Sequence, residues 1–320
     1  MNCLIVQPIH EAGLARLRAA GITPVACPDA RMATVARMLP GMTAAITRDA
    51  GFSAEAFAAA DGLRVVAVHG SGHDAVDKAA ATEKGVLVAN APGLNARSVA
   101  ELAVGLAVAA SRGIAAGDAA ERAGAPGFRY SRSFGELFGK TALIVGWGRI
   151  GRMTGEMLVR GFGMQVLVWS PRAPETGGFA RPATLAEGLA AADLVSLHTP
   201  MSPATRHMID ARSLAGMKPG AVLVNTARAG LVDEEALAAA LEEGRIAGAG
   251  LDVYSDAAPA GRLGRAPGAI FTPHLGATTE EALIRVALAS AEHVITALAG
   301  GIPETALNAA ALAGQGSLGG

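Results

Sequence analysis

Three glycines in the stretch GWGRIG have the spacing of a turn that binds the phosphates of a dinucleotide. In such a turn Gly146 permits the tight bend, Gly148 lets the backbone approach a pyrophosphate, and Gly151 lets a helix pack against the preceding strand. The residues before the glycines predict a strand and those after them a helix. The amides of Arg149 and Ile150 would then face the phosphates. The sequence predicts a dinucleotide-binding site.

The next apolar run, QVLVWS, ends at Ser170, where the ribose of such a nucleotide is expected. A site that prefers NAD places an acid there, roughly 20 residues after the glycines, and this chain has none. Ser170 and Arg172 instead offer a hydroxyl and a cation, which suit a 2′-phosphate, although Arg172 after Pro171 could also be only a solvated loop residue. We therefore expect NADP(H) in preference to NAD(H), with NAD(H) as the alternative.

Short runs rich in β-forming residues alternate along the chain with Ala-rich helical stretches. Runs such as VLVW and VLVN are apolar on both faces, as expected of parallel strands covered by helices on each side. The pattern predicts an α/β fold with doubly wound parallel sheets.

Two such series are separated by the segment Ile114 to Lys140, which lacks apolar periodicity and is expected to be a loop or crossing region. We predict a substrate-binding domain of residues 1–95 plus 292–320 and a nucleotide-binding domain of residues 96–291. The last helix, from Thr279 to Ala299, would return the chain to the first domain. The active site is expected in the cleft between the domains.

Composition argues against several other classes of function. The net charge is −1 and there is no basic block, so we expect neither nucleic acid nor a membrane surface as a partner. Cys3 and Cys27 have no metal-ligand spacing, and two thiols in 320 residues fit a reducing compartment. We find no signal peptide, and the richest apolar run is too short to span a bilayer. A cytoplasmic protein without a metal site is expected.

Four motifs in order carry a resemblance to a known family: GWGRIG, VNTARAGLVDEEAL from Val224, GAGLDVY from Gly248 and TPHLGATTEEA from Thr272. From about residue 40 to about residue 295 the chain resembles the D-isomer-specific 2-hydroxyacid dehydrogenases, which include phosphoglycerate dehydrogenases and glyoxylate/hydroxypyruvate reductases. The resemblance implies a flavodoxin-like substrate domain with an inserted Rossmann NAD(P)-binding domain, which accounts for the late glycine turn. It also implies a homodimer joined through the cofactor domains, with Ile114 to Lys140 contributing.

The reaction implied by the resemblance is hydride transfer to a 2-oxo acid, and it needs a cation and an acid. Arg228 follows the strand AVLVNTA, and its planar guanidinium suits a carboxylate. A mere helix-capping role for Arg228 fits poorly, because DEEAL from Asp233 already supplies acids there. His274 lies after an apolar strand, and an imidazole can give and recover a proton in each cycle.

The chain departs from the family at the carboxylate that pairs with this histidine. The family has a Glu five residues after the Asp of LDV, and counting from Asp252 that position is Ala257. Either Asp256, just before it, takes over as a third catalytic residue, or His274 works without a carboxylate partner.

Other positions are implied by their motifs. Gly70, Ser71 and Gly72 resemble the loop whose amides hold the substrate carboxylate, although an ordinary turn would look the same. Arg48 matches a substrate-contacting position of phosphoglycerate dehydrogenases, and Asp252 could equally cap a strand end. The expected cofactor contacts beyond the glycine turn and ribose site are Thr199, Thr226, Ala227, Asp252, Gly276 and Ala277.

The substrate is expected to be small and unphosphorylated. Val68 stands where the family often has an Arg, and a phosphorylated substrate normally needs more than one cation. Reduction of glyoxylate or hydroxypyruvate to the D-2-hydroxy acid is therefore favoured. The alternatives are a D-3-phosphoglycerate dehydrogenase, an NAD(P)-sensing binding protein on the same fold, and an enzyme acting on an inorganic or one-carbon anion.

Overall fold

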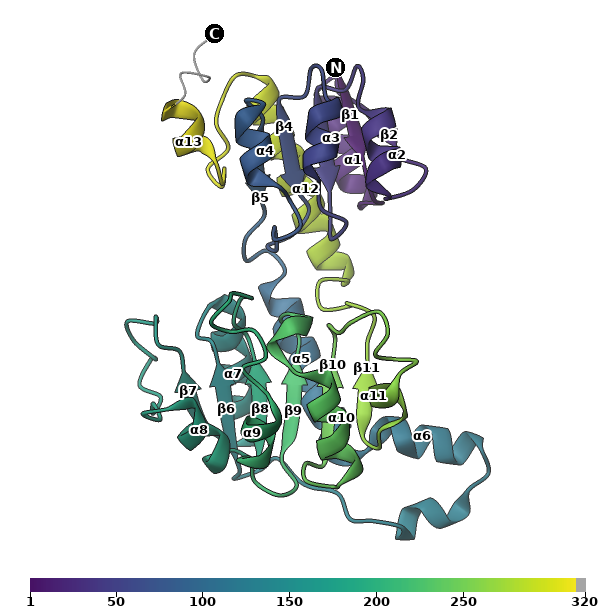
Figure 1. Ribbon diagram of the computed structural model, residues 1–320, viewed down its shortest axis with the longest axis vertical. Coiled ribbons are helices and arrows are strands. Elements are labelled where there is room, and N and C mark those ends of the chain that lie inside the picture. The colour runs from purple at the N-terminus through teal and green to yellow at the C-terminus, as the bar shows by residue number, and fades with distance from the viewer. Residues whose placement is uncertain (315–320) are drawn as a thin grey trace. The chain divides into compact units, whose positions relative to one another are not determined.

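The computed structural model describes residues 1–314 (Figure 1). The chain divides into two compact units: unit 1 consists of Met1–Asn95 and the residues from Ala277 onward, and unit 2 of Ala96–Gly276. The second boundary differs from the expected one at residue 292. The reason is that helix α12 (Glu280–Leu298) is continuous and packs along its length against elements of unit 1.

Unit 1 is a parallel sheet of order β2-β1-β3-β4-β5 with helices on both faces. Its strands are β1 (Asn2–Ile5), β2 (Thr23–Ala26), β3 (Ala44–Thr47), β4 (Val65–Val68) and β5 (Leu87–Asn90). Its helices are α1 (Glu11–Ala19), α2 (Met32–Met38), α3 (Ala54–Ala59), α4 (Lys78–Glu83), α12 and α13 (Ala309–Gly314). This strand order is that of flavodoxin-like folds.

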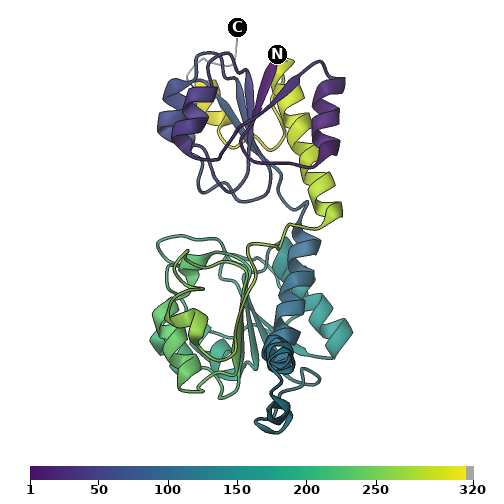
Figure 2. The ribbon, with the colours of Figure 1, turned by 90° about the vertical axis from the view of Figure 1, so that its right-hand side faces the viewer.

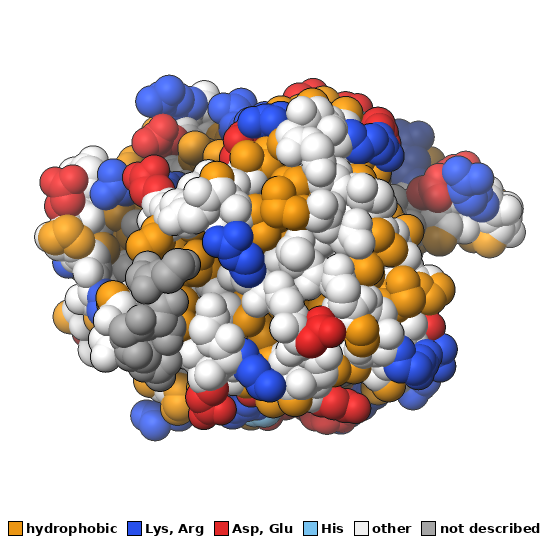
Figure 3. All heavy atoms as spheres, turned by 90° about the horizontal axis from the view of Figure 1, so that it is seen from above, with side chains coloured by type: hydrophobic (Ala, Val, Ile, Leu, Met, Phe, Trp, Pro, Cys, Tyr) orange, Lys and Arg blue, Asp and Glu red, His pale blue; other side chains and the backbone are white. Residues whose placement is uncertain are grey.

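The strands of unit 1 are buried on both faces because alternate residues point into different cores. Leu4 and Val66 belong to a cluster with Phe57, whereas Ile5 and Val65 belong to one with residues of α12. Helix α1 approaches α12 so closely that a Cβ at Gly13 would lie 2.8 Å from the carbonyl oxygen of Ala287. On the face drawn in Figure 3, acidic and basic side chains are interspersed and neither kind forms a continuous patch.

Unit 2 is a parallel sheet of order β11-β10-β9-β8-β6-β7. Its strands are β6 (Thr141–Val145), β7 (Gln165–Trp169), β8 (Leu194–Leu197), β9 (Val222–Asn225), β10 (Gly248–Leu251) and β11 (Ala269–Phe271). Its longer helices are α5 (Ala96–Arg112), α6 (Ile114–Arg122), α7 (Arg149–Phe162), α8 (Leu185–Ala191) and α10 (Glu234–Glu242). Its shorter ones are α9 (Ala211–Ala215), α11 (Arg262–Arg265) and the 3-10 turns η1 (Pro126–Tyr130) and η2 (Ala229–Leu231). The strand order reverses beside β6, which makes a crevice at the carboxyl ends of the strands, where nucleotides bind in such sheets.

The segment Ile114 to Lys140 is partly helical, which corrects the expectation of a loop. It contains α6 and η1, neither of which buries a residue, and both extend away from the sheet of unit 2 (Figures 1 and 2). Without a buried face, these helices show no apolar periodicity in the sequence. We call residues 114–138 the arm.

Within residues 1–314, no single helix is long and apolar enough to cross a bilayer, and α5 with α6 reaches that length only as a pair bent by 60°. The same residues contain no group of three or more His, Cys, Asp or Glu side chains that could hold a metal ion.

Candidate active site

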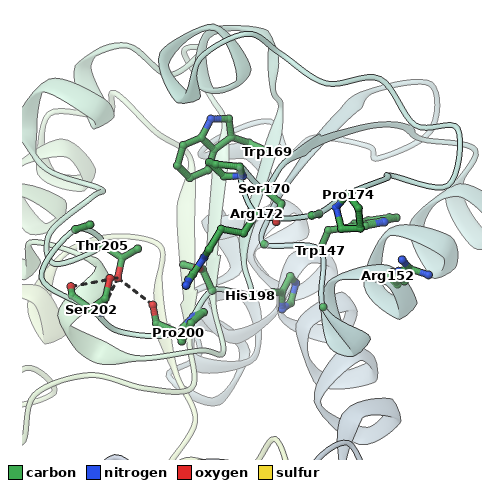
Figure 4. A pocket seen from close by; sticks show the side chains of 16 residues that line it. Trp147, Arg152, Trp169, Ser170, Arg172, Pro174, His198, Pro200, Ser202 and Thr205 are labelled. Atoms are coloured by element: carbon green, nitrogen blue, oxygen red, sulfur yellow. Dashed lines mark hydrogen bonds between the residues drawn. The ribbon is translucent and has the colours of Figure 1, made fainter.

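Unit 2 has a cavity of about 660 Å³ at the carboxyl ends of its strands (Figure 4). Its walls come from the loops that follow β6, β7 and β8, together with Arg152 on α7. Both tryptophans of the chain, Trp147 and Trp169, line it. The predicted residues Gly146, Gly148, Ser170, Arg172 and Thr199 are therefore brought together in one cavity.

The glycine turn has the geometry that a dinucleotide requires. Gly146 has φ +99°, and a Cβ there would lie 2.4 Å from the carbonyl oxygen of His198. A Cβ at Gly151 would lie 2.1 Å from the carbonyl oxygen of Gly146, so both positions require glycine. Around Gly148 there is open space, and no side chain in the described part of the chain caps the amides that begin α7 at Arg149. These residues fit a pyrophosphate at the helix N-terminus.

The ribose side of the cavity offers a hydroxyl and cations. Ser170 and Arg172 both line it, and Arg172 extends from the loop after β7 toward Pro200 (Figure 4). The cavity lining contains no Asp or Glu. This part of the cavity therefore combines a hydroxyl and cations, and its lining has no carboxylate.

His198 forms another part of the wall. Its Nε2 lies 2.9 Å from the Oγ of Ser196 on β8, and burial lowers the pKa of His198 to about 3. The imidazole is therefore neutral near pH 7 and adds hydrogen-bonding capacity to the cavity without adding charge.

The loop after β9 presents Thr226, Ala227 and Arg228. It is shaped by Asn225, whose side-chain oxygen accepts a hydrogen bond from the Ala227 amide at 3.0 Å and whose Nδ2 donates to the carbonyl of Arg228 at 2.8 Å. The guanidinium Nη1 of Arg228 donates to the carbonyl of Ala227 at 2.7 Å. The hydroxyl of Thr226 is buried and has no hydrogen-bond partner among the described residues, so it can serve a ligand.

The loop of His274 is held by Asp252, whose side chain is 1% exposed. One carboxylate oxygen accepts hydrogen bonds from the Thr272 hydroxyl at 2.6 Å and the Leu275 amide at 2.7 Å, and the other accepts from the Gly276 amide at 2.9 Å. His274 itself has φ +55° and is an exposed residue. Of the two roles expected for Asp252, these contacts fit the cap at the strand end.

Among the described residues, no carboxylate in direct contact with His274 replaces the one that the family places next to this histidine. Asp256 and Ala257 are exposed, and within residues 1–314 no hydrogen bond or ion pair joins Asp256 to His274. The loop of Asp256 is instead tied to α10, because Glu234 accepts hydrogen bonds from the Ser255 amide at 2.7 Å and from its hydroxyl.

The expected substrate residues of unit 1 lie at the carboxyl ends of β3 and β4. The loop of Gly70, Ser71 and Gly72 is fixed by its neighbours: the side-chain Nδ2 of Asn90 donates to the Ser71 carbonyl at 2.8 Å, and the Ser71 hydroxyl accepts from the backbone amide of Gly93 at 3.1 Å. Arg48 donates to the carbonyl of Pro8 at 3.0 Å. Burial and the charge of Arg48 lower the pKa of the adjacent His69 to about 4.

Residues 104–276 match the family model of the D-isomer specific 2-hydroxyacid dehydrogenase NAD binding domain. The chain belongs to this family. The resemblance predicted from the motifs is therefore confirmed, as is the fold of two doubly wound parallel sheets.

The chain has relatives with two kinds of name. It is 44% identical to a D-3-phosphoglycerate dehydrogenase of Mycobacterium tuberculosis over 261 residues. This match covers 80% of this chain and 49% of the relative. It is 36% identical over 267 residues to a hydroxypyruvate reductase of Thermotoga maritima, covering 82% of this chain and 87% of the relative. The chain thus spans about half the length of the phosphoglycerate dehydrogenases it matches.

Two solved structures have closely similar folds. A protein from Thermus thermophilus has a TM-score of 0.87 at 32% identity, covering 96% of this chain and 100% of that one. A glyoxylate reductase from Paecilomyes thermophila has a TM-score of 0.84 at 29% identity, covering 96% and 98%.

Several residues that shape the site were not identified from the sequence. Asn225 is polar at the end of an apolar strand, a signal that could have indicated its role. Trp147, at the centre of the glycine turn, packs edge-on against Phe179 and fixes one wall of the cavity. Glu234 and Ser255 are 21 residues apart, and no local pattern links them.

Proposed function

We propose that the protein is an NAD(P)-dependent oxidoreductase that reduces a small 2-oxo acid to the D-2-hydroxy acid. One observation supports this most directly. Arg228 follows β9 and His274 follows β11, and β10 pairs in parallel with both of these strands. The two residues therefore lie at the carboxyl ends of strands in the same sheet, at the edge where the glycine turn also lies. That edge is where such sheets bind their ligands.

Each residue has a distinct role in this proposal. Arg228 binds the carboxylate of the substrate with its guanidinium and polarises the adjacent carbonyl. His274 donates a proton to the carbonyl oxygen as that oxygen gains charge. A reduced nicotinamide cofactor, when bound at the glycine turn, supplies the hydride. Asp252 keeps the loop of His274 in place, and Thr226 offers its unused hydroxyl to the ligand.

We propose that the cofactor is NADP(H) rather than NAD(H). The pyrophosphate would lie on Gly146, Gly148, Arg149, Ile150 and Gly151. Ser170 and Arg172 would contact the 2′-phosphate, since the loop after β7 contributes no acid to the cavity. Further contacts to the cofactor are proposed for Thr199, Ala227, Gly276 and Ala277.

In unit 1, we propose that the amides of Ser71 and Gly72 bind a carboxylate, while the Gly70 amide donates to the carbonyl of Val68 at 2.9 Å and shapes the loop. An unphosphorylated substrate such as glyoxylate or hydroxypyruvate is favoured because Val68 is apolar and buried where a second cation would be needed, and Arg48 already donates to Pro8. The relative named hydroxypyruvate reductase is also matched over most of its length.

A second candidate is a D-3-phosphoglycerate dehydrogenase. It is favoured by the 44% identity to proteins of that name and by Arg48. A nucleotide-sensing protein is the third candidate, since His274 has no carboxylate partner among the described residues.

The test is a reductase assay in which NADPH and NADH are each mixed with glyoxylate, hydroxypyruvate and 3-phosphohydroxypyruvate. We expect the absorbance of the reduced cofactor to fall fastest with NADPH and an unphosphorylated acid, and expect Arg228→Gln and His274→Gln to abolish most of that rate. Cofactor binding without turnover on any acid would overturn the proposal in favour of the sensor.

We also propose a homodimer in which the arm contributes to the contact between the nucleotide-binding units. Its support is the exposure of large apolar side chains there: Tyr130 is 81% exposed, Phe138 78% and Ile114 54%. Such side chains are common in contacts between subunits.

A further inference from the structure

We infer that Arg152 and Glu175 form a charge pair that sets how strongly the cavity binds a 2′-phosphorylated adenosine nucleotide. Arg152 acts as a second cation for the 2′-phosphate, beside Arg172, and Glu175 competes with that phosphate for Arg152. The inference rests on the proposed function, because it concerns the ribose end of the nucleotide site.

Arg152 reaches the cavity from a different element than Arg172 does. It lies one turn into α7, directly after the third glycine of the motif, and it lines the cavity together with Ser170 and Arg172 (Figure 4). A phosphate bound beside Ser170 would therefore have a guanidinium on the loop after β7 and another on α7. Two guanidinium groups suit a phosphate monoester, which carries a charge of about −1.5 to −2 near neutral pH.

Glu175 follows Arg172 by three residues on the same loop and faces the same cation. The Nη2 of Arg152 lies 3.9 Å from the Oε1 of Glu175, and the two side chains are 48% and 74% exposed. A pair this long and this exposed is weak, so Arg152 can exchange the carboxylate for a phosphate at little cost. The same carboxylate repels an incoming phosphate, so Glu175 lowers the preference that the two arginines create.

A charge pair that lies entirely on α7 provides a matched control. Glu156 and Arg160 are 3.7 Å apart, with side chains 50% and 80% exposed, and neither lines the cavity. Replacing Arg160 or Glu156 by Gln alters the net charge of the protein by the same amount as replacing Arg152 or Glu175. Any general effect of net charge on nucleotide binding is therefore measured separately from the effect of the Arg152–Glu175 pair.

The test is calorimetric titration of the full chain with adenosine 2′,5′-bisphosphate and with ADP, which differ in the position of one phosphate and need no turnover. We expect Arg152→Gln to weaken binding of the 2′,5′-bisphosphate about fivefold and of ADP less than about twofold. We expect Glu175→Gln to strengthen binding of the 2′,5′-bisphosphate about twofold to fivefold. Arg160→Gln and Glu156→Gln should change neither ligand by more than about twofold.

Tryptophan fluorescence gives a second readout of the same effect. Trp147 and Trp169 both line the cavity, so quenching on titration with NADPH or NADH reports binding at this site. Arg152→Gln should raise the dissociation constant for NADPH more than that for NADH.

The inference is overturned if Arg152→Gln weakens both ligands equally, or if it has no more effect than Arg160→Gln. It is also overturned if wild-type protein binds the 2′,5′-bisphosphate no better than ADP. In that last case the NADP preference fails as well, while reduction of 2-oxo acids with NADH would still support the proposed dehydrogenase. Conversely, if the ligands bind as expected but no 2-oxo acid is reduced, the proposed reductase function is overturned. The role of Arg152 and Glu175 in nucleotide binding is then still supported.

Discussion

The buried carboxylate of Asp252 accepts a hydrogen bond from the amide of Gly276 at 2.9 Å, although the residues are 24 positions apart. The same carboxylate binds the Leu275 amide and the Thr272 hydroxyl, so three donors around His274 depend on one side chain. The loop holds His274 at φ +55°, a backbone conformation that is costly for a residue with a Cβ. Asp252 thereby positions the proposed acid.

We predict that Asp252→Asn destabilises the protein and slows turnover. The asparagine would face its NH₂ group toward one of the donors, which costs about 1–3 kcal/mol in unfolding free energy. Urea unfolding and kcat for 2-oxo acid reduction measure the two effects. Unchanged unfolding and unchanged kcat would show that the loop of His274 does not depend on this carboxylate.

Replacement of His207 by glycine should stabilise the protein. His207 has φ +48°, and its amide donates to the carbonyl of Gly230, so the backbone there is fixed in the left-handed region. Glycine adopts this conformation without the steric cost, so we expect the free energy of unfolding to rise by about 1 kcal/mol. His207→Ala, which keeps a Cβ, is the control and should bring no such gain. Equal melting temperatures for the two variants would contradict the explanation.

The parts of the site that could be predicted from the sequence are those that lie at strand ends. Runs such as VLVN identify buried parallel strands, and the carboxyl ends of such strands share one edge, so Arg228 and His274 could be assigned to it. The contacts of Asp252 and Glu234 could not, because their partners are 20 or more residues away. The end of unit 2 at Gly276 depends on which strands α12 packs against, and its own periodicity does not contain that information.

Acid should destabilise the fold through His198. Burial lowers the pKa of His198 in the folded state to about 3 from an ordinary value of 6.5. Above pH 6.5 the imidazole is therefore neutral in both the folded and the unfolded state, and the free energy of unfolding does not depend on it. Below pH 6.5 the unfolded state binds a proton that the folded state does not, and the loss reaches up to about 2 kcal/mol at pH 5. His198→Gln should remove that part of the pH dependence, measured by urea unfolding between pH 7 and pH 5. An unchanged slope in this variant would mean that His198 is protonated in the fold.

Asp256→Asn should leave the pH profile of kcat/KM unchanged. The family's carboxylate is absent at Ala257, and no contact in the described part of the chain joins Asp256 to His274. A profile that moves toward lower pH in the variant would instead identify Asp256 as the replacement for that carboxylate. Asp118→Asn, on the arm, is the control for the loss of one acidic charge.

Finally, acidic residues on the arm should disrupt the proposed dimer. Tyr130 and Phe138 are the most exposed large apolar side chains of residues 1–314, and α6 and η1 bury no residue within their own chain. An aspartate at either position would have to be desolvated in a subunit contact, so we expect Tyr130→Asp and Phe138→Asp to yield monomers by size-exclusion chromatography with light scattering. Ile302→Asp, which makes the same kind of change on an exposed side chain of unit 1, should leave the mass at that of the dimer. A wild-type protein that is monomeric at every concentration tested would refute the assignment of the arm as a subunit contact.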